Sequence, residues 1–294
     1  MLGIVPGHKA AFLTLSLLVV GCASHVPSGG LRPPFAAEAR PVIVAHRGGS
    51  LEAPENTLAA VMHAIEVGSD WQEIDVQLSK DQRVVLMHDD TLDRTTNGSG
   101  PVGEMLAVDL QQLTAGQPDL SARVKARLET LGVSAPAFDD RFAREKVPSL
   151  EQVLRLKDSR LMIEIKTDPR AELVVRKVVE EIDRAGARDR VAIASFDRAI
   201  LEQVMERAPS ISLIGIAKTK RAIKEKLELP IRVLAVRASL ARVALKRAPT
   251  GVAVWVYTAY TPKQARDLAQ QGVQGIVTDA PAQVLRLRHE EGGE

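Results

Sequence analysis

Short runs rich in β-branched residues recur along this chain and alternate with segments in which apolar residues return every three or four positions. This alternation is typical of strand–helix–strand units, in which consecutive strands lie parallel in one sheet. Eight runs are present and no second set remains for another domain, so the sequence predicts an α/β fold, a single (β/α)8 barrel. The predicted strands are residues 42–47, 72–78, 161–166, 191–196, 212–217, 232–236, 252–257 and 275–279. The clearest helical stripes are Leu58, Val61, Met62 and Ile65 after the first strand, and Leu173, Val174, Val178, Val179 and Ile182 after the third.

A further apolar run, residues 83–88, follows the second strand after a very short connection, Lys80-Asp81-Gln82. A parallel crossover needs about a dozen residues, so this run must return antiparallel as a hairpin. The hairpin turns at the C-terminal end of the second strand, and active sites of this architecture lie at that end. The sequence therefore predicts that His88 lies near the barrel mouth.

The long connection that follows, about residues 89–146, has no clear strand, a weak helical pattern and frequent Gly, Pro and Asp. Loops of this length are uncommon in compact domains and are usually functional. We interpret the connection as an inserted cap segment beside the active-site face. A merely tolerated surface insertion is the alternative.

The N-terminal residues have the pattern of an export signal. Residues 10–20 are an apolar run that is too short to remain as a membrane-spanning helix. Cys22, the only cysteine, follows a small residue at the end of this run, which resembles the lipobox of bacterial lipoproteins. We therefore predict a signal peptide over residues 1–21, a lipidated N-terminus and tether over 22–39, and a folded domain over 40–294. The protein would be exported and anchored to a membrane, whereas a plain secretory signal with a coincidental cysteine would give no anchor.

The overall composition is that of an ordinary globular protein. With 45% hydrophobic and 26% charged residues, the chain can bury a sizeable core and is not disordered throughout. The formal net charge is only +2, and the basic residues are scattered among acidic ones. No positive stripe is present, so nucleic acid is not an expected partner.

Charged residues interrupt the apolar strands. Glu73 and Asp75 are two apart on the second predicted strand, so their side chains point to the same side of the barrel wall. Glu164 repeats the pattern on the third strand and is followed two residues later by Lys166. The residues that alternate with them are apolar and would face the helices, so we expect the charges inside the barrel. A solvent-facing stripe, or a salt-bridge network with Arg47 and Lys166, is the alternative.

Carboxylates that are buried together repel one another unless a cation lies between them. Three carboxylates from neighbouring strands would suit one hard divalent cation, Mg²⁺ or Ca²⁺, with water or substrate oxygens completing the coordination shell. Zinc is a poorer fit, because the domain has no cysteine to offer and few histidines.

Two histidines are candidates for proton transfer. His46 and His88 both lie at predicted strand ends near the barrel mouth. Two imidazoles can divide the cleavage of a phosphodiester, since one can accept the nucleophile's proton while the other donates a proton to the leaving alkoxide. Arg47 and Lys166 are candidate phosphate ligands. The remaining histidines lie in the signal, the tether, the first helix and the tail: His8, His25, His63 and His289.

Several short motifs occur in a fixed order along the domain. They are His46-Arg47-Gly48, Pro54-Glu55-Asn56-Thr57, Glu73 with Asp75-Val76, His88-Asp89, Leu92-Asp93-Arg94-Thr95-Thr96, Glu164-Ile165-Lys166, Ser195-Phe196, Trp255 and Thr278-Asp279-Ala280-Pro281. In order and spacing they resemble the glycerophosphodiester phosphodiesterase family, over about residues 42–281. Residues 117–146 match little of the family pattern, and we expect them to contribute to substrate choice.

The resemblance implies a TIM barrel with His46 and His88 as the acid–base pair. It implies that Glu73, Asp75 and Glu164 are the ligands of Mg²⁺ or Ca²⁺. It also implies roles in substrate binding for five further residues: Arg47, Glu55 and Lys166 near the metal or phosphate, and Phe196 and Trp255 as apolar walls for the alcohol moiety. Asp279 precedes a predicted helix, and we interpret it as an ordinary helix N-cap.

The leading hypothesis is therefore hydrolysis of a glycerophosphodiester to glycerol 3-phosphate and an alcohol. The alternative enzyme is phospholipase D-like and acts on lysophospholipids or sphingolipids at the membrane surface; an apolar groove beside the insertion would favour it. A third hypothesis is a catalytically silent lipoprotein that binds phosphorylated ligands. Such a protein would have no need of His88.

Replacing Cys22 with serine should release the protein from membranes, because the substitution removes the acylation site. Fractionation of cells that express each form would show the protein moving from the membrane to the soluble fraction. Ser24→Ala, a neighbouring change that leaves Cys22 intact, is the matched control and should stay with the membrane. A Cys22→Ser protein that remains membrane-bound contradicts the lipobox prediction.

Overall fold

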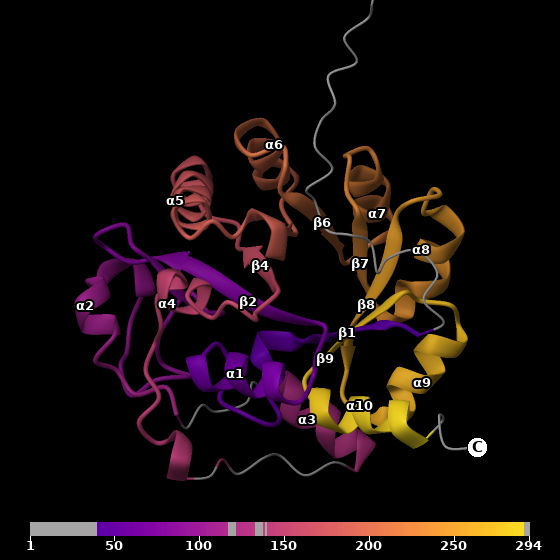
Figure 1. Ribbon diagram of the computed structural model, residues 1–294, viewed down its shortest axis with the longest axis horizontal. Helices are drawn as coiled ribbons and strands as arrows, with labels where there is room; N and C mark the ends of the chain where they lie inside the picture. The colour runs from indigo at the N-terminus through magenta and orange to yellow at the C-terminus, as the bar shows by residue number, and fades with distance from the viewer. Residues whose placement is uncertain (1–39, 117–121, 133–137, 139, 291–294) are drawn as a thin grey trace, which may run out of the picture.

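The computed structural model describes residues 40–116, 122–132, 138 and 140–290, and the predictions for residues 1–39, including that for Cys22, lie outside them. The predicted parallel strands are all present, and they close into a TIM barrel surrounded by helices (Figure 1). β1 closes the ring because it pairs with both β2 and β9. The strands of the ring are β1 (Val42–Ala45), β2 (Trp71–Leu78), β4 (Leu161–Ile165), β5 (Val191–Ser195), β6 (Ser212–Ala217), β7 (Val233–Arg237), β8 (Ala253–Ala259) and β9 (Gly275–Thr278).

The predicted hairpin is present and lies outside the ring. β2 pairs with β1 near its own start, where Val44 lies opposite Trp71. Beyond the end of β1, β2 pairs with β3 (Val84–Leu86), which runs antiparallel and places Leu86 opposite Val76. β2 thus extends past its neighbour and offers its free edge to the returning chain.

Helices cover the outside of the barrel. The stripes predicted after the first and third strands form α1 and α5, but Met62 is 47% exposed, because α1 buries Val61 together with the small residues Ala60 and Ala64. α1 begins after Thr57, whose hydroxyl accepts a hydrogen bond from the backbone N–H of Ala60. Within the described residues, no helix is both long enough and apolar enough to cross a membrane. The helices around the barrel are α1 (Leu58–Glu66), α4 (Leu150–Leu154), α5 (Ala171–Arg184), α6 (Arg198–Arg207), α7 (Lys220–Leu227), α8 (Ala241–Arg247), α9 (Pro262–Gln270) and α10 (Pro281–Glu290).

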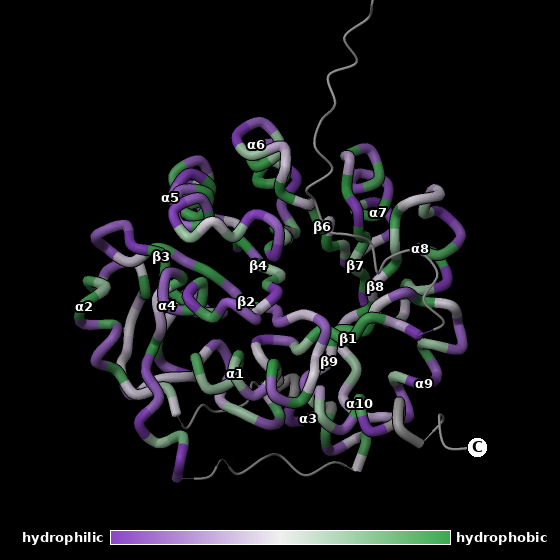
Figure 2. Tube along the Cα trace, in the orientation of Figure 1, coloured by the Kyte–Doolittle hydropathy of each residue, from purple (hydrophilic) through white to green (hydrophobic). Residues whose placement is uncertain are grey.

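Apolar side chains form two layers of core. Residues on the outward face of the strands pack under the helices, and residues on the inward face fill the barrel. On β4, Ile163 and Ile165 belong to the outer layer and Met162 to the inner one, as the alternation of side chains along a strand requires. Trp71 and Trp255 fill the interior with ring centroids 6.4 Å apart. Figure 2 shows the strands mainly in hydrophobic colours, whereas the helices alternate between hydrophobic and hydrophilic.

The insertion after β3 contains two helices that its sequence pattern does not predict. α2 (Ala107–Leu110) is a single turn, and α3 (Ala122–Leu131) buries only Leu128 among those of its side chains that the structure describes. A segment that buries so little has a weak 3.6-residue period, so its helix is hard to detect. The insertion also packs on β3 through a small core of its own: Val85, Met87, Leu92, Val102, Leu110, Ala115 and Val147.

Leu234→Ala should destabilise the domain by about 2–5 kcal/mol, because Leu234 on β7 is fully buried in the outer core layer and its truncation leaves a cavity. Leu106→Ala is the matched control, since Leu106 is 42% exposed, and its cost should stay within about 0.5 kcal/mol. Urea denaturation, monitored by circular dichroism, measures the free energy of unfolding of both variants. Equal losses in the two variants would contradict the packing of β7 against the helices.

Candidate active site

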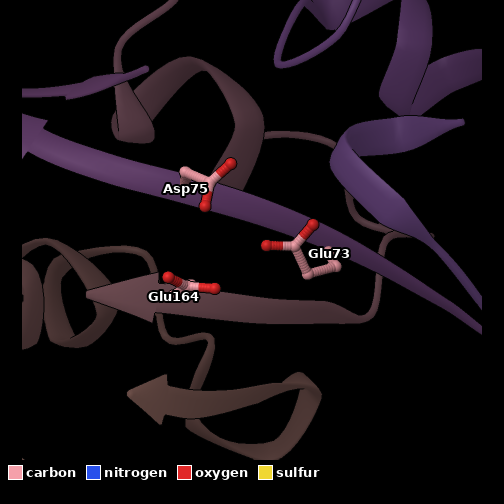
Figure 3. Close-up of side chains that lie close together, drawn as sticks. All are labelled: Glu73, Asp75 and Glu164. Atoms are coloured by element: carbon pink, nitrogen blue, oxygen red, sulfur yellow. The ribbon is translucent and has the colours of Figure 1, made fainter. Parts of the chain in front are cut away.

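Three carboxylates converge inside the barrel. Asp75 on β2 pairs with Glu164 on β4, and Glu73 lies two residues before Asp75 on the same face. All three side chains are buried, and one carboxylate oxygen of each lies within 4.8 Å of the others (Figure 3). The burial excludes a solvent-facing stripe.

The protein compensates these three charges only in part. Burial, and then the charges of Asp75 and Glu164, raise the pKa of Glu73. Burial would also raise the pKa of Asp75, but the positive charges of Lys166, His88 and Arg47 together outweigh it, and that pKa is lowered. Lys166 Nζ lies 2.6 Å from Asp75 Oδ1 and 2.5 Å from Glu164 Oε1. Glu73 Oε1 is buried and has no hydrogen-bond partner among the described residues. A divalent cation would satisfy this oxygen and reduce the repulsion, so the three carboxylates fit a metal site.

His46 leaves β1 in a tight turn that holds it beside the carboxylates. Gly48 in this turn has a φ of +83°, and a Cβ there would lie 2.6 Å from the Cβ of Ala60, so the turn requires glycine. His46 Nδ1 lies 2.5 Å from Asp279 Oδ1, and His46 Nε2 lies 4.0 Å from Glu73 Oε2. Burial would lower the pKa of His46, but the charge and hydrogen bond of Asp279 together with the charge of Glu73 outweigh it, and the pKa is raised. With Nδ1 held by Asp279, Nε2 is the nitrogen directed at the carboxylates.

His88 follows β3 and is oriented in a similar way. Its Nδ1 lies 2.6 Å from Asp89 Oδ1, and Arg94 Nε donates a hydrogen bond of 2.6 Å to Asp89 Oδ2. The backbone N–H of Met87 donates to the carbonyl oxygen of Asp75 at 3.1 Å. This bond fixes the end of the hairpin against β2, and His88 interacts electrostatically with Asp75.

Glu55 is held between two guanidinium groups. Arg47 Nη1 lies 2.8 Å from Glu55 Oε1, and Arg94 Nη1 lies 2.7 Å from Glu55 Oε2. Burial would raise the pKa of Glu55, but the two arginines lower it to about 2. Arg47 also approaches the carboxylate group, with Nε 3.5 Å from Asp75 Oδ2. Glu55 therefore stays charged, and the contacts of its oxygens are with arginines.

The two aromatic residues predicted as walls for an alcohol have different surroundings. Trp255 is 0% exposed and packs against Trp71, so the structure does not support a direct contact between Trp255 and a ligand. Phe196 is half-buried at the end of β5 and meets Tyr257 edge to face, with ring centroids 6.1 Å apart. Of the two aromatic residues, Phe196 is the one that a bound molecule could reach.

Four residues that hold this arrangement received no site role from the sequence: Asn56, Asp89, Arg94 and Asp279. The interpretation of Asp279 as a helix N-cap is wrong. Its carboxylate bonds His46 and accepts a hydrogen bond of 2.7 Å from Ser50 Oγ, while the first N–H groups of α10 donate to Glu52 instead. All four residues occur within the recognised motifs, so the signal was present. Asp89 bonds the adjacent His88, whereas the partners of Asn56 and Asp279 become apparent only in the folded barrel.

Comparison with known proteins identifies the family. Residues 46–283 match the Glycerophosphoryl diester phosphodiesterase family. The chain belongs to this family. A glycerophosphodiester phosphodiesterase of Caldanaerobacter subterraneus is 32% identical over 266 residues, which cover 85% of this chain and 99% of that protein. The resemblance seen in the motifs is confirmed, and so is the expectation that the chain is an enzyme of this class.

Solved structures of family members share the fold. A phosphodiesterase of Oleispira antarctica, solved in complex with the product sn-glycerol-3-phosphate, has a TM-score of 0.72 and 25% identity, with 85% of this chain and 97% of that chain covered. A glycerophosphodiester phosphodiesterase of Agrobacterium tumefaciens has a TM-score of 0.63 and 28% identity, with coverage of 83% and 98%. Both alignments extend over nearly the whole of the relative.

Mg²⁺ or Ca²⁺ should stabilise the folded protein, and Glu73→Gln should remove most of that effect. A cation that binds only the folded state contributes about 2.7 kcal/mol at a concentration of 100 times its dissociation constant. Denaturation with added ion and with chelator measures the difference. Glu181→Gln is the matched control, because Glu181 on α5 is also buried but lies outside the candidate site. A wild-type protein whose stability does not respond to either ion would contradict the metal site.

Proposed function

We propose that this protein hydrolyses glycerophosphodiesters to glycerol 3-phosphate and an alcohol, with one divalent cation and two histidines. The observation that carries the proposal is the group of three buried carboxylates, with His46 Nε2 4.0 Å from Glu73 and with His88 in electrostatic interaction with Asp75. The family and the product bound to the Oleispira antarctica relative support the same substrate class.

The two histidines would carry out the proton transfers. A carboxylate at Nδ1 of each ring, Asp279 for His46 and Asp89 for His88, fixes the ring and leaves Nε2 for reaction. One imidazole would accept a proton from the attacking oxygen, and the other would donate a proton to the departing alkoxide. Attack by water and attack by a neighbouring hydroxyl of the substrate need the same pair.

The charged groups around the carboxylates would bind the phosphodiester. Bound Mg²⁺ or Ca²⁺ would neutralise charge on the phosphoryl oxygens as the reaction proceeds. Arg47 and Lys166 point their cationic groups at the same place, since both contact Asp75. Arg94 positions Arg47 indirectly, because Arg94 binds Glu55 and Glu55 in turn binds Arg47.

The phospholipase D-like alternative would need an apolar groove for an acyl chain beside the insertion. A groove of about 710 Å³ does lie between α1 and the insertion, where Leu58, Met62 and Phe142 contribute to its wall. However, most of the residues that line it are polar or charged, and none of them is a candidate site residue. The groove therefore does not favour lysophospholipids or sphingolipids over smaller diesters.

We also propose that the enzyme acts outside the cytoplasm, anchored by lipid at Cys22. The support is the apolar run and the small residue that precede this cysteine. An anchored enzyme would meet diesters released from membrane lipids close to their source.

His46→Ala and His88→Ala should each lower kcat for glycerophosphocholine by about 100- to 10,000-fold, the usual contribution of a general acid or base. Turnover of purified residues 40–294 with Mg²⁺ or Ca²⁺ measures the effect, and circular dichroism checks the fold. His63→Ala is the matched control, because His63 on α1 pairs with Glu52 away from the carboxylates, and it should keep nearly full activity. Retained hydrolysis by the His46, His88 double variant would refute the assignment.

A further inference from the structure

The barrel mouth has a second group of charged side chains, on the strands that lie across the ring from β2 and β4. In the closed order of strands, β7 is opposite β2 and β8 is opposite β4 (Figure 1). Ala235 on β7 pairs with Trp255, and two residues later Arg237 pairs with Tyr257. Ala235 and Trp255 belong to the inner core layer, so Arg237 and Tyr257 are on the inward face at the C-terminal end.

Lys218 lies beside this pair. Ile216 on β6 is aligned with Ala235 and belongs to the same inner layer, and Lys218 comes two residues later, just beyond the strand. Lys218 Nζ sits 3.9 Å from the centroid of the Phe196 ring. The hydroxyl of Tyr257 donates to the carbonyl oxygen of Ala217 at 3.2 Å, which ties the end of β8 to that of β6.

Neither of these two cations forms an ion pair within the described part of the chain, although Lys218 is exposed to solvent and lies over the ring of Phe196. Arg47, Arg94 and Lys166 all contact carboxylates, as described above. Among the described residues, by contrast, neither Lys218 nor Arg237 has a carboxylate within ion-pair distance. Arg237 Nε is buried and has no hydrogen-bond partner there, a state that costs free energy and that an anionic ligand would relieve.

We propose that Lys218 and Arg237 form a second anion-binding site, which selects glycerophosphodiesters whose alcohol moiety carries a phosphate or a carboxylate of its own. This inference rests on the proposed function. An eight-stranded barrel has an interior just wide enough for side chains or one small ligand, so a diester held over the carboxylates of β2 and β4 would extend toward β7 and β8. A guanidinium and an ammonium together suit either kind of anion.

The same groups disfavour a cationic alcohol such as choline. Its quaternary ammonium would meet the positive charges of Lys218 and Arg237 at this end of the mouth, and no carboxylate of the described residues is paired with either. Aromatic faces normally attract such a cation, but the face of Phe196 is already covered by Lys218.

The test is a series of diesters that differ in the charge of the alcohol: glycerophosphocholine, glycerophosphoglycerol, glycerophosphoglycerol with a terminal phosphate, and glycerophosphoglycerate. Wild-type kcat/KM should be highest for the phosphate-bearing or the carboxylate-bearing diester, and the comparison between them identifies which anion the site takes. Arg237→Gln and Lys218→Gln should each lower kcat/KM for that diester by about 10- to 100-fold, the worth of one hydrogen bond to a charged group, and leave glycerophosphoglycerol unchanged. Lys263→Gln, at an 83% exposed side chain on α9, is the matched control and should change nothing.

Calorimetric titration of the His46→Ala protein with the same diesters repeats the comparison without turnover. If wild type hydrolyses none of the diesters, the proposed function fails, while the binding series still decides the anion site. Equal losses for neutral and anionic diesters in the Arg237 and Lys218 variants, or equal binding of all four diesters, would overturn the anion site and leave the proposed function intact.

Discussion

The repulsion between three carboxylates buried in one barrel governs the arrangement of this site. Glu73, Asp75 and Glu164 lie above an interior filled by apolar side chains, where their charges are poorly screened. Such a group can persist only if cations surround it, and Lys166 and Arg47 supply part of that compensation. The negative charge that these cations do not compensate is concentrated on Glu73, whose pKa is raised and whose Oε1 has no hydrogen-bond partner among the described residues. The surroundings of Glu73 therefore favour a bound cation, at the point where a phosphodiester would bring further negative charge.

One of the carboxylates that orient the histidines comes from a distant part of the chain, and the other belongs to the residue next to its histidine. Asp279 reaches His46 because β9 closes the ring against β1, and Asp89 holds His88 at the start of the insertion. Arg94 in the insertion bonds Asp89 and Glu55, so the insertion is connected to the turn after β1. The site is therefore formed by ring closure and by the insertion together, and neither provides it alone.

The sequence predicted those features that depend on local spacing. The β-branched runs predicted the strands, the three-residue connection predicted the hairpin, and the two-residue spacing of Glu73 and Asp75 predicted that their side chains share the inner face. Features that depend on tertiary neighbours were missed. Asp279 looked like a helix cap because its partner is far away in the sequence, and Met62 looked like core because a stripe of apolar residues does not show which edge of a helix faces solvent. The roles of the histidines in proton transfer stay a prediction, although His46 lies 4.0 Å from Glu73 and His88 interacts electrostatically with Asp75.

Because β2 extends past β1, the strand pair that carries His88 is distinct from most of the insertion that follows it. The pairing of β3 with β2 and the bond from Met87 to Asp75 fix the backbone that leads into His88, and these residues precede the insertion. The parts of the insertion outside the core that packs on β3 can therefore lengthen, shorten or change their composition without moving that imidazole. Such a division would let evolution, or a designer who exchanges this segment between relatives, alter what the mouth of the barrel admits while the reacting centre keeps its geometry.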